Sequence, residues 1–258
     1  MNTQVVFISG GATGIGRVIA RRFLETGSRV HVADNNPESI AQFIVEHPGT
    51  TGSVCDVGHV DQVDRAFDEL EATHGRLDVL INNAGISGPT ARVEDIAAAD
   101  WDRTIAVDLN GQFYCARRAV PMLRAAGGGS LICMASTSGL FGCPLRSPYT
   151  AAKWAIIGFV KTLAMELGPE KIRVNAICPG SVSGPRIDGV IERDAASRGM
   201  QTQQIRDIYL RQISMRTFVE AEDVAEMAYF LTSAAGAKIS GQALAVDGHT
   251  EGLTNWLD

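Results

Sequence analysis

Residues 4–16 read "QVVFISGGATGIG", an apolar run that leads directly into a glycine-rich turn. Glycine lets the chain turn sharply and lets backbone N–H groups approach a phosphate at the positive end of a following helix. Residues with the spacing of one apolar helix face do follow the turn: Ile15, Val18, Ile19 and Phe23. A glycine pattern alone is a weak signal, because glycines also form ordinary turns. Here strand, loop and helix stand in the order that a dinucleotide site requires.

Six further apolar runs follow, and segments with helical periodicity lie between most of them. The seven runs are QVVFIS (4–9), RVHVAD (29–34), GSVCDV (52–57), LDVLINN (77–83), SLICMAS (130–136), IRVNAIC (172–178) and QALAVD (242–247). Near-continuous apolar strands that alternate with helices indicate a parallel sheet covered on both faces. We therefore predict a single doubly wound α/β domain of the Rossmann type over residues 1–258. Its seven-stranded parallel sheet should carry helices on both faces.

The composition excludes some classes of partner. The 258 residues are 45% hydrophobic and 20% charged, as expected of a globular chain with a sizeable core. A net charge of -6 argues against nucleic acid or an anionic membrane surface as a main partner. The N-terminus has no cationic signal-peptide region, and the longest uncharged stretch is glycine-rich and a poor membrane span. We therefore expect a cytoplasmic protein.

The cysteines and histidines show no pattern of metal ligands. The five cysteines are an odd number without a C-x-x-C pair, which fits reduced, packed thiols better than disulfides or a zinc site. The five histidines do not cluster with metal-ligand spacing either. We therefore predict no metal site.

An acid follows the glycine-rich turn at the end of the second apolar run. A carboxylate at the place of Asp34 accepts hydrogen bonds from the adenosine ribose hydroxyls and repels a 2′-phosphate. The alternative is an ordinary cap or turn residue before residues 35–37. Thr13 rather than a cation precedes Gly14, and Asn35 stands where a phosphate reader would be Arg or Lys. We therefore predict NAD as the cofactor, preferred over NADP.

With these motifs the chain resembles the short-chain dehydrogenase/reductase family, in its shorter branch. The glycine spacing matches T-G-x-x-x-G-x-G, with Ser9 in place of the threonine. Asp56 resembles the family acid that hydrogen-bonds the adenine amino group. "NNAG" at residues 82–85 resembles the motif that steadies the sheet beside the cofactor. The resemblance covers essentially the whole chain.

The resemblance extends to the turn after the sixth apolar run. "CPGSVSGPR" at residues 178–186 is similar to the family's turn at the nicotinamide, with Ser183 where a threonine is usual. The motifs and the resemblance together imply these cofactor-binding residues: Gly10, Thr13, Gly14, Ile15, Gly16, Asp34, Asp56, Val57, Asn83, Ala84, Gly85, Tyr149, Lys153, Pro179, Gly180, Val182 and Ser183.

Residues 130–153 contain a candidate catalytic set. Tyr149 and Lys153 are four residues apart, just over one helical turn, so both side chains point the same way. Ser136 precedes Tyr149 at the family's spacing, and Asn110 in "VDLNG" matches the asparagine that completes the family's set. The resemblance implies that these four residues are catalytic. In it, Asn110 holds a water that relays protons from Lys153.

The residue types also have chemical reasons. Hydride transfer at an alcohol carbon requires a proton to move on the oxygen, and a free phenol is a poor base at neutral pH. Lys153, together with the positive nicotinamide, would stabilise the phenolate form of Tyr149. Ser136 would donate to the substrate oxygen and stabilise developing charge there. Singly, each residue fits an ordinary loop or core position, and only their joint spacing favours catalysis.

Residues 184–218 break the alternation of strands and helices. The segment is polar and rich in arginine, and it contains one predicted amphipathic helix with Ile205, Ile208, Tyr209 and Ile213 on its apolar face. An insertion of this size is often a substrate lid. The alternative is a helix that packs in an oligomer.

Two sets of residues are candidates for the substrate. Arg186 could clamp a carboxylate, sulfonate or phosphate, unless the arginines of this segment pair with surface acids: Asp188, Glu192, Asp194 and Asp207. Leu140, with neighbours up to residue 145, could instead line a pocket for an apolar ketone or ring alcohol. Neutral alcohols or polyols, hydroxy acids and ring ketones all stay open.

The sequence therefore predicts an NAD-dependent oxidoreductase that transfers a hydride between a secondary alcohol, or its ketone, and the nicotinamide. Tyr149 would be the acid/base. One alternative is a non-catalytic dinucleotide-binding regulator, which could dispense with the acid–base residues. Another is an epimerase or dehydratase, which would usually carry a longer C-terminal substrate domain. The resemblance implies a homotetramer, because residues 239–249 look like the family's last strand at a subunit interface.

Overall fold

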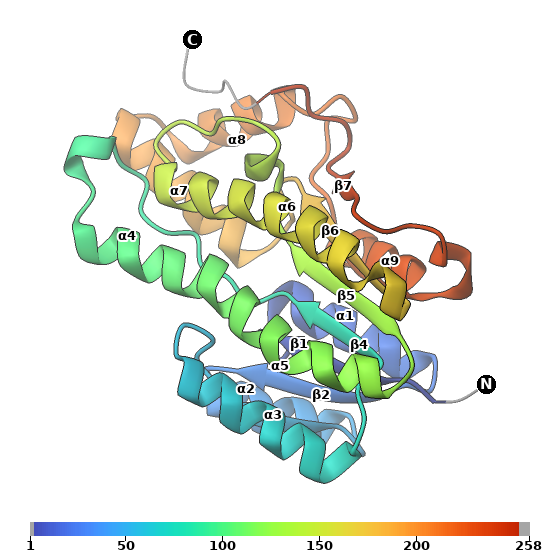
Figure 1. The fold of residues 1–258 in the computed structure, drawn as a ribbon. Helices are drawn as coiled ribbons and strands as arrows, with labels where there is room; N and C mark the ends of the chain where they lie inside the picture. The colour runs from blue at the N-terminus through green and yellow to red at the C-terminus, as the bar shows by residue number, and fades with distance from the viewer. Residues whose placement is uncertain (1–2, 253–258) are drawn as a thin grey trace.

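The computed structural model describes residues 3–252, and its centre is a seven-stranded sheet (Figure 1). All neighbouring strands run parallel, in the order β3-β2-β1-β4-β5-β6-β7. The strands are β1 (Val5–Ser9), β2 (Arg29–Asp34), β3 (Thr51–Val54), β4 (Val79–Asn82), β5 (Gly129–Met134), β6 (Ile172–Pro179) and β7 (Ala243–Val246). The predicted doubly wound fold is confirmed. The predicted span of 1–258 reaches past the described residues at both ends.

Helices cover both faces of the sheet. α1, α2 and α9 pack on one face and α3, α5 and α6 on the other, as Figure 1 shows for the front helices α5 and α6. The helices are α1 (Gly14–Glu25), α2 (Pro37–Glu46), α3 (Val60–His74), α4 (Ala98–Ile105), α5 (Gly111–Ala125), α6 (Ser147–Leu167), α7 (Pro185–Arg198), α8 (Thr202–Arg211) and α9 (Ala221–Thr232). A π-helical segment, Ala106–Asn110, joins α4 to α5.

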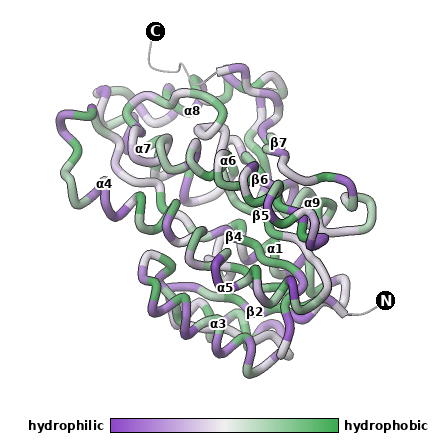
Figure 2. The backbone as a smooth tube through the Cα atoms, viewed as in Figure 1, coloured by the Kyte–Doolittle hydropathy of each residue, from purple (hydrophilic) through white to green (hydrophobic). Residues whose placement is uncertain are grey.

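The strands bury apolar side chains on both faces, because successive residues of a strand point to opposite sides. In β1, Phe7 packs into the core beneath α3 and α5, whereas Val6 and Ile8 pack into the core beneath α1 and α9. Figure 2 shows the central strands as mainly hydrophobic, with hydrophilic residues along the outer helices. This two-sided burial fixes the register of the sheet and therefore the positions of the strand ends.

The strand order reverses between β1 and β4. The chain builds β1, β2 and β3 towards one edge, then returns to place β4 on the other side of β1. In open parallel sheets the crevice outside the carboxyl ends of the strands at this point is the usual ligand site. The glycine-rich turn after β1 and the NNAG motif after β4 both lie there.

The segment 184–218 forms two helices, where the sequence predicted one. α8 carries the predicted apolar face except for Ile213, which follows the helix, and it begins with a capping box between Gln201 and Gln204. α7 was missed because half of its residues are polar or charged; Pro185 starts it, and Gly199 ends it in the left-handed conformation. The two helices share a small apolar cluster of their own, which includes Ile191 and Ile205.

Candidate active site

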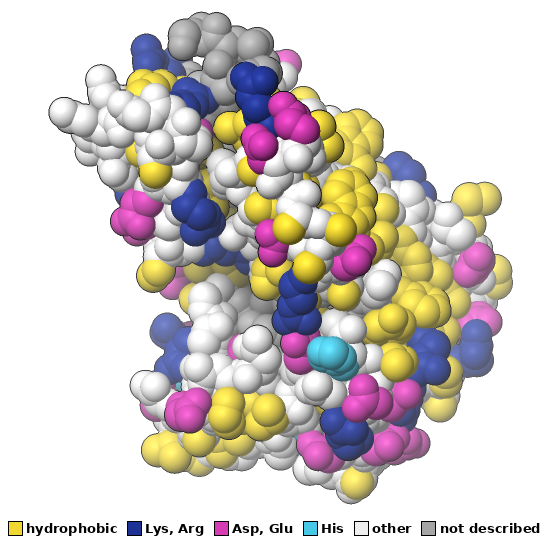
Figure 3. Space-filling model, turned by 90° about the vertical axis from the view of Figure 1, so that its left-hand side faces the viewer, with side chains coloured by type: hydrophobic (Ala, Val, Ile, Leu, Met, Phe, Trp, Pro, Cys, Tyr) yellow, Lys and Arg dark blue, Asp and Glu magenta, His cyan; other side chains and the backbone are white. Residues whose placement is uncertain are grey.

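A cleft of about 710 Å³ opens at the strand-order reversal, within the size range of small-molecule and cofactor sites. Figure 3 shows this face of the molecule hollowed, with Lys and Arg side chains around the hollow. All but one of the predicted cofactor-binding residues line the cleft. The exception is Gly16, which stands directly behind the turn. A Cβ there would collide with the carbonyl oxygen of Gly10.

The glycine-rich turn fits a phosphate group. Gly10 and Gly14 have φ angles of 59° and 52°, which favour glycine. A Cβ on Gly10 would lie 3.0 Å from Ala84 Cα, so the turn packs tightly on the NNAG motif, whereas the space in front of Gly14 is open. Because Gly14 also begins α1, free backbone N–H groups at this helix end can meet a phosphate.

The NNAG motif fastens the end of β4 to the turn after β1. Asn83 Nδ2 donates to the carbonyl oxygens of Ser9 and Gly10, at 3.1 and 3.0 Å. Ser9 Oγ accepts from the backbone N–H groups of Asn83 and Ala84, both at 3.1 Å. Ser9 therefore supplies the hydroxyl contact at the place where the family's threonine stands.

Two carboxylates lie at the end of the cleft where the sequence predicts the adenosine. Asp34 is 6% exposed; its oxygens accept from Ala12 N at 3.2 Å and Asn36 N at 3.3 Å, which fixes the side chain. Asp56 pairs with Arg103 at 2.7 Å and accepts from Gly58 N at 2.9 Å. Burial raises the pKa of Asp56, but these hydrogen bonds outweigh it and hold the pKa below its ordinary value. This end therefore carries fixed negative charge at neutral pH.

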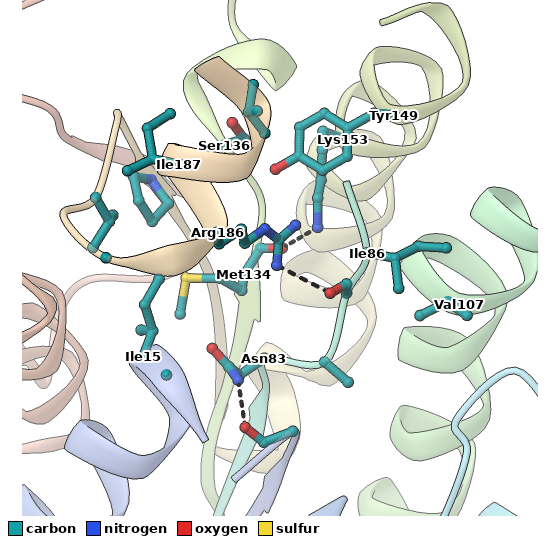
Figure 4. Close-up of a pocket in the computed structure, with 18 of the residues that line it drawn as sticks. Ile15, Asn83, Ile86, Val107, Met134, Ser136, Tyr149, Lys153, Arg186 and Ile187 are labelled. Atoms are coloured by element: carbon teal, nitrogen blue, oxygen red, sulfur yellow. Dashed lines mark hydrogen bonds between the residues drawn. The ribbon is translucent and has the colours of Figure 1, made fainter. Parts of the chain in front are cut away.

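Ser136, Tyr149 and Lys153 meet at the other end of the cleft (Figure 4). Lys153 is 2% exposed; its Nζ donates to Met134 O at 3.0 Å and lies 5.4 Å from the centroid of the Tyr149 ring. Ser136 Oγ accepts from Ser138 N at 3.1 Å, which uses a lone pair and leaves its O–H to donate into the cleft. The three predicted residues are thus brought together.

Asn110 does not join them. Within residues 3–252 it makes no hydrogen bond to Lys153, and it does not line the cleft. The side chain that approaches Lys153 belongs to Asp108, whose Oδ2 lies 3.7 Å from the Lys153 Nζ. Asp108 is fully buried, and its Oδ1 accepts from Ile86 N at 2.7 Å. The π-helical turn over Ala106–Asn110 points Asp108 inward, a phase that sequence spacing does not reveal.

The turn after β6 lines the same cleft as Tyr149 and Lys153. Gly180 packs on Asp247, where a Cβ would lie 2.8 Å from the Asp247 Cβ. Ser183 Oγ donates to Glu220 at 2.8 Å, and Val182 forms a bridge with Val219. These contacts hold the turn against α9 and β7.

The two predicted substrate residues take different places. Arg186 lines the cleft and donates from Nη1 to Gly85 O at 3.0 Å, across the cleft from its own helix α7 (Figure 4). Leu140 does not line the cleft and packs instead against the core beneath α6. Sequence reasoning missed Arg146, which lines the cleft with its guanidinium carbon 4.8 Å from the centroid of the Tyr149 ring.

Residues 3–252 contain neither a candidate metal site nor a candidate membrane span. No group of three or more His, Cys, Asp or Glu side chains in that range could hold a metal ion. No helix there is long and apolar enough to cross a membrane.

Comparison with known proteins identifies the family. The sequence model of a family described as Enoyl-(Acyl carrier protein) reductase matches residues 10–250. Momilactone A synthase of Oryza sativa subsp. japonica is 37% identical over 250 residues, 95% of this chain and 89% of that protein. D-beta-hydroxybutyrate dehydrogenase of Rhizobium meliloti (strain 1021) is 32% identical over 253 residues, 95% of this chain and 98% of that protein.

A solved structure agrees with the sequence matches. The crystal structure of NAD+-bound xylitol dehydrogenase superposes with a TM-score of 0.91 at 26% identity and covers 96% of this chain and 99% of that one. The fold and the matches define the class as that of oxidoreductases with a nicotinamide cofactor. Within that class, the chain belongs to the short-chain dehydrogenase/reductase family.

Proposed function

We propose that the protein is an NAD-dependent oxidoreductase that transfers a hydride between a secondary alcohol, or its ketone, and the nicotinamide. Tyr149 is the acid/base in this proposal. The observation that carries it is the meeting of Ser136, Tyr149 and Lys153 at one end of a cleft whose other end holds the glycine-rich turn and Asp34. The relatives' names cover a neutral polyol and a hydroxy acid, so they leave the substrate open.

The chain's own groups handle the proton. Bound nicotinamide supplies the hydride acceptor or donor. During oxidation Tyr149 accepts the proton of the substrate hydroxyl, and during reduction it returns a proton to the new hydroxyl. Ser136 donates its O–H to the substrate oxygen, holding it near Tyr149 and stabilising charge that develops there. The Lys153 ammonium, on the same helix, favours the phenolate through its charge.

Asp108 positions Lys153 in this proposal. Two opposite charges that are almost completely buried stabilise each other and hold the ammonium at a fixed place beside Tyr149. The same carboxylate holds Ile86 N, and so shapes the segment after NNAG that faces the cleft. We therefore propose that Asp108 supports Lys153 by positioning it, a role that differs from the water-holding role that the resemblance had given to Asn110.

NAD is preferred over NADP in this proposal because of Asp34. Its carboxylate is held by two backbone N–H groups at the adenosine end, and the next residue is Asn35 rather than a cation. A 2′-phosphate would meet this negative charge, and Arg103, which lines the cleft, is already paired with Asp56.

The homotetramer also stays a proposal. Three large apolar side chains on α5 and α6 are well exposed, at 49%, 51% and 82%: Phe113, Trp154 and Met165. A neighbouring subunit would cover them. The cytoplasmic location expected from the sequence stays a prediction as well.

Replacing Tyr149 with Phe tests the function. We expect kcat for the best alcohol in a substrate panel to fall about 1,000-fold, since the acid/base is lost, while the NADH dissociation constant changes less than about threefold. Steady-state assays of NADH formation measure kcat, and fluorescence titration measures the NADH dissociation constant. Retained turnover in this variant would show that Tyr149 is not the acid/base. A wild type that binds NADH but oxidises no alcohol would favour the regulator instead.

A further inference from the structure

Three guanidinium groups meet at residues 85–87, the segment that follows NNAG and faces Tyr149. Arg146 Nη2 donates to Ser87 O at 2.7 Å, and Arg193 Nη2 donates to Ser87 Oγ at 3.1 Å. Arg186 Nη1 donates to Gly85 O at 3.0 Å. All three acceptors are neutral oxygens. The arginines come from α7 and from the residue before α6, so two separate elements direct positive charge to one place.

No carboxylate of residues 3–252 forms an ion pair with any of these three arginines. Other arginines in the same part of the fold do have acidic partners: Arg198 pairs with Asp194 at 3.0 Å, and Arg206 pairs with Asp188. Pairing with acids, the alternative for the whole segment, therefore holds for those two arginines and not for Arg186 and Arg193, although the Arg198–Asp194 pair is largely buried rather than at the surface. Asp194, the acid that borders the same small cavity as Arg146, is already paired with Arg198.

The neighbouring thiol does not supply the missing charge. Cys143 lines the cleft beside Arg146, and burial raises the pKa of this thiol, although Arg146 acts in the opposite direction. The thiol therefore stays neutral at physiological pH, and the end of the cleft beyond Tyr149 keeps an excess of positive charge.

Arg146 is the most confined of the three cations. Its residue is only 9% exposed, and its Nε is completely buried without a hydrogen-bond partner. One of its five N–H donors is used, by Ser87 O. A buried guanidinium that bonds no carboxylate is costly: Asp194, on the same small cavity, is paired with Arg198 instead. An anion that enters the cleft would offset that cost. The side chain thus has the features of a group that binds an anion.

The position of Arg146 separates it from the phosphate end of the cofactor site. Besides the cleft, it borders a small cavity lined with residues of α7, α8, the loop before α6 and the loop after β4, among them Val190, Asp194 and Thr90. No residue of the glycine-rich turn lines that cavity. An anion at Arg146 would therefore belong to the substrate.

We propose that the substrate carries a carboxylate, so that the enzyme acts on a hydroxy acid or its keto acid, and that Arg146 binds this carboxylate. The proposal rests on the proposed function. The reacting carbon lies between Ser136 and Tyr149, and the carboxylate lies on the side of Tyr149 that faces Ser87 and α7. The planar guanidinium matches a carboxylate with two parallel hydrogen bonds. Arg186 and Arg193, both exposed, attract anions to the mouth of the cleft.

Matched pairs of compounds test the substrate class. We would measure kcat/KM with NAD for 3-hydroxybutyrate and 3-hydroxycyclohexanecarboxylate, each beside its primary amide, which has almost the same shape and no charge. The wild type should prefer each acid by at least about tenfold. As a readout independent of turnover, butyrate should bind the protein–NADH complex more tightly than butyramide in a calorimetric titration. A sulfonate analogue shows whether any oxyanion suffices.

Variants identify the residue. Arg146→Gln should lower kcat/KM for the acids about 100-fold, the cost of removing one partner of a buried charge pair, and for the amides by less than about threefold. Arg146→Lys keeps the charge without the planar fork and should lose about tenfold for the acids. Arg211→Gln is the matched control, because it removes an exposed arginine of α8 that does not line the cleft. It should leave kcat/KM unchanged for the acids and for the amides.

The possible failures are distinguishable. Equal losses for acids and amides in Arg146→Gln, with or without a lower melting temperature, would overturn the proposal and make Arg146 a residue that only supports Tyr149 or the loop. A wild type that turns over the amides as well as the acids would overturn the anion proposal and leave the proposed function intact. A wild type that oxidises no compound of the panel while binding NADH would overturn both.

Discussion

The two ends of the cleft present different chemical groups to a ligand. At the adenosine end the groups that face a ligand are mostly backbone, in the glycine-rich turn and NNAG, with two fixed carboxylates, Asp34 and Asp56. At the chemical end they are mostly side chains, and the charged ones are cations, Lys153 and the arginines around Ser87. The first end is suited to a ligand that never varies, and the second to a ligand that differs from one family member to the next.

This difference predicts how the ends respond to substitution. Backbone N–H groups at the end of a strand stay in place as long as the sheet is intact, so side-chain changes there should tune preference rather than abolish turnover. At the chemical end each side chain provides a charge or a proton that no other group supplies, and its loss should lower kcat or kcat/KM.

The largest effect in this comparison should come from Asp108. Asp108→Ala removes both the counter-charge of Lys153 and the acceptor of Ile86 N, and we expect kcat to fall about 100-fold, which corresponds to about 3 kcal/mol. Asp108→Asn keeps the acceptor and should stay within about tenfold of the wild type. Steady-state kinetics with the best substrate, and NADH titrations to show that the cleft is intact, measure these effects.

Asn110→Ala is the matched control for that prediction. Its side chain makes no hydrogen bond to Lys153 within the described residues, so kcat should change less than about threefold. The reverse ranking, a large loss for Asn110→Ala and a small one for Asp108→Ala, would contradict the positioning role of Asp108 and support the role that the resemblance gave to Asn110.

The Asn110 example shows where sequence reasoning stops. The alternation of apolar runs and helical segments was enough to predict seven strands, their direction and the site at their carboxyl ends, because the sheet buries both faces. The i, i+4 pair of Tyr149 and Lys153 was also readable, because α6 is a regular helix. Which side chain of residues 106–110 points towards Lys153 could not be predicted, because a π-helical turn breaks the regular helical spacing there.

Asp34 should have the next largest effect, on cofactor preference alone. Asp34→Ala removes the buried negative charge at the adenosine end, and we expect the ratio of kcat/KM for NAD to that for NADP to fall about 30-fold. The kcat with saturating NAD should stay within about threefold, since the chemical end is unchanged. Asp61→Ala, an exposed acid on α3, is the control for overall charge. An unchanged ratio would show that Asp34 does not discriminate between the 2′-hydroxyl of NAD and the 2′-phosphate of NADP.

Arg146 escaped the sequence reasoning for a different reason. It follows Leu145, whose φ of 64° turns the chain in the left-handed conformation just before α6. No periodicity indicates which way a side chain points after such a turn. Arg186 did stand out by its place after the proline-glycine turn, but its acceptor, Gly85 O, is 101 residues away in the chain, and only the folded sheet brings the two together.

The smallest effect should come from Arg186, and it sharpens the comparison within the chemical end itself. Arg186 is exposed and bonded to a backbone carbonyl, so water screens its charge, whereas Arg146 is buried. Arg186→Ala should therefore lower kcat/KM for a hydroxy acid only about threefold, and more weakly at high salt. Measuring kcat/KM of the wild type and of Arg186→Ala at low and at high ionic strength tests this expectation. A salt-independent loss as large as that of Arg146→Gln would instead make Arg186 the residue that binds the anion, because a strong effect without screening requires direct contact with the substrate.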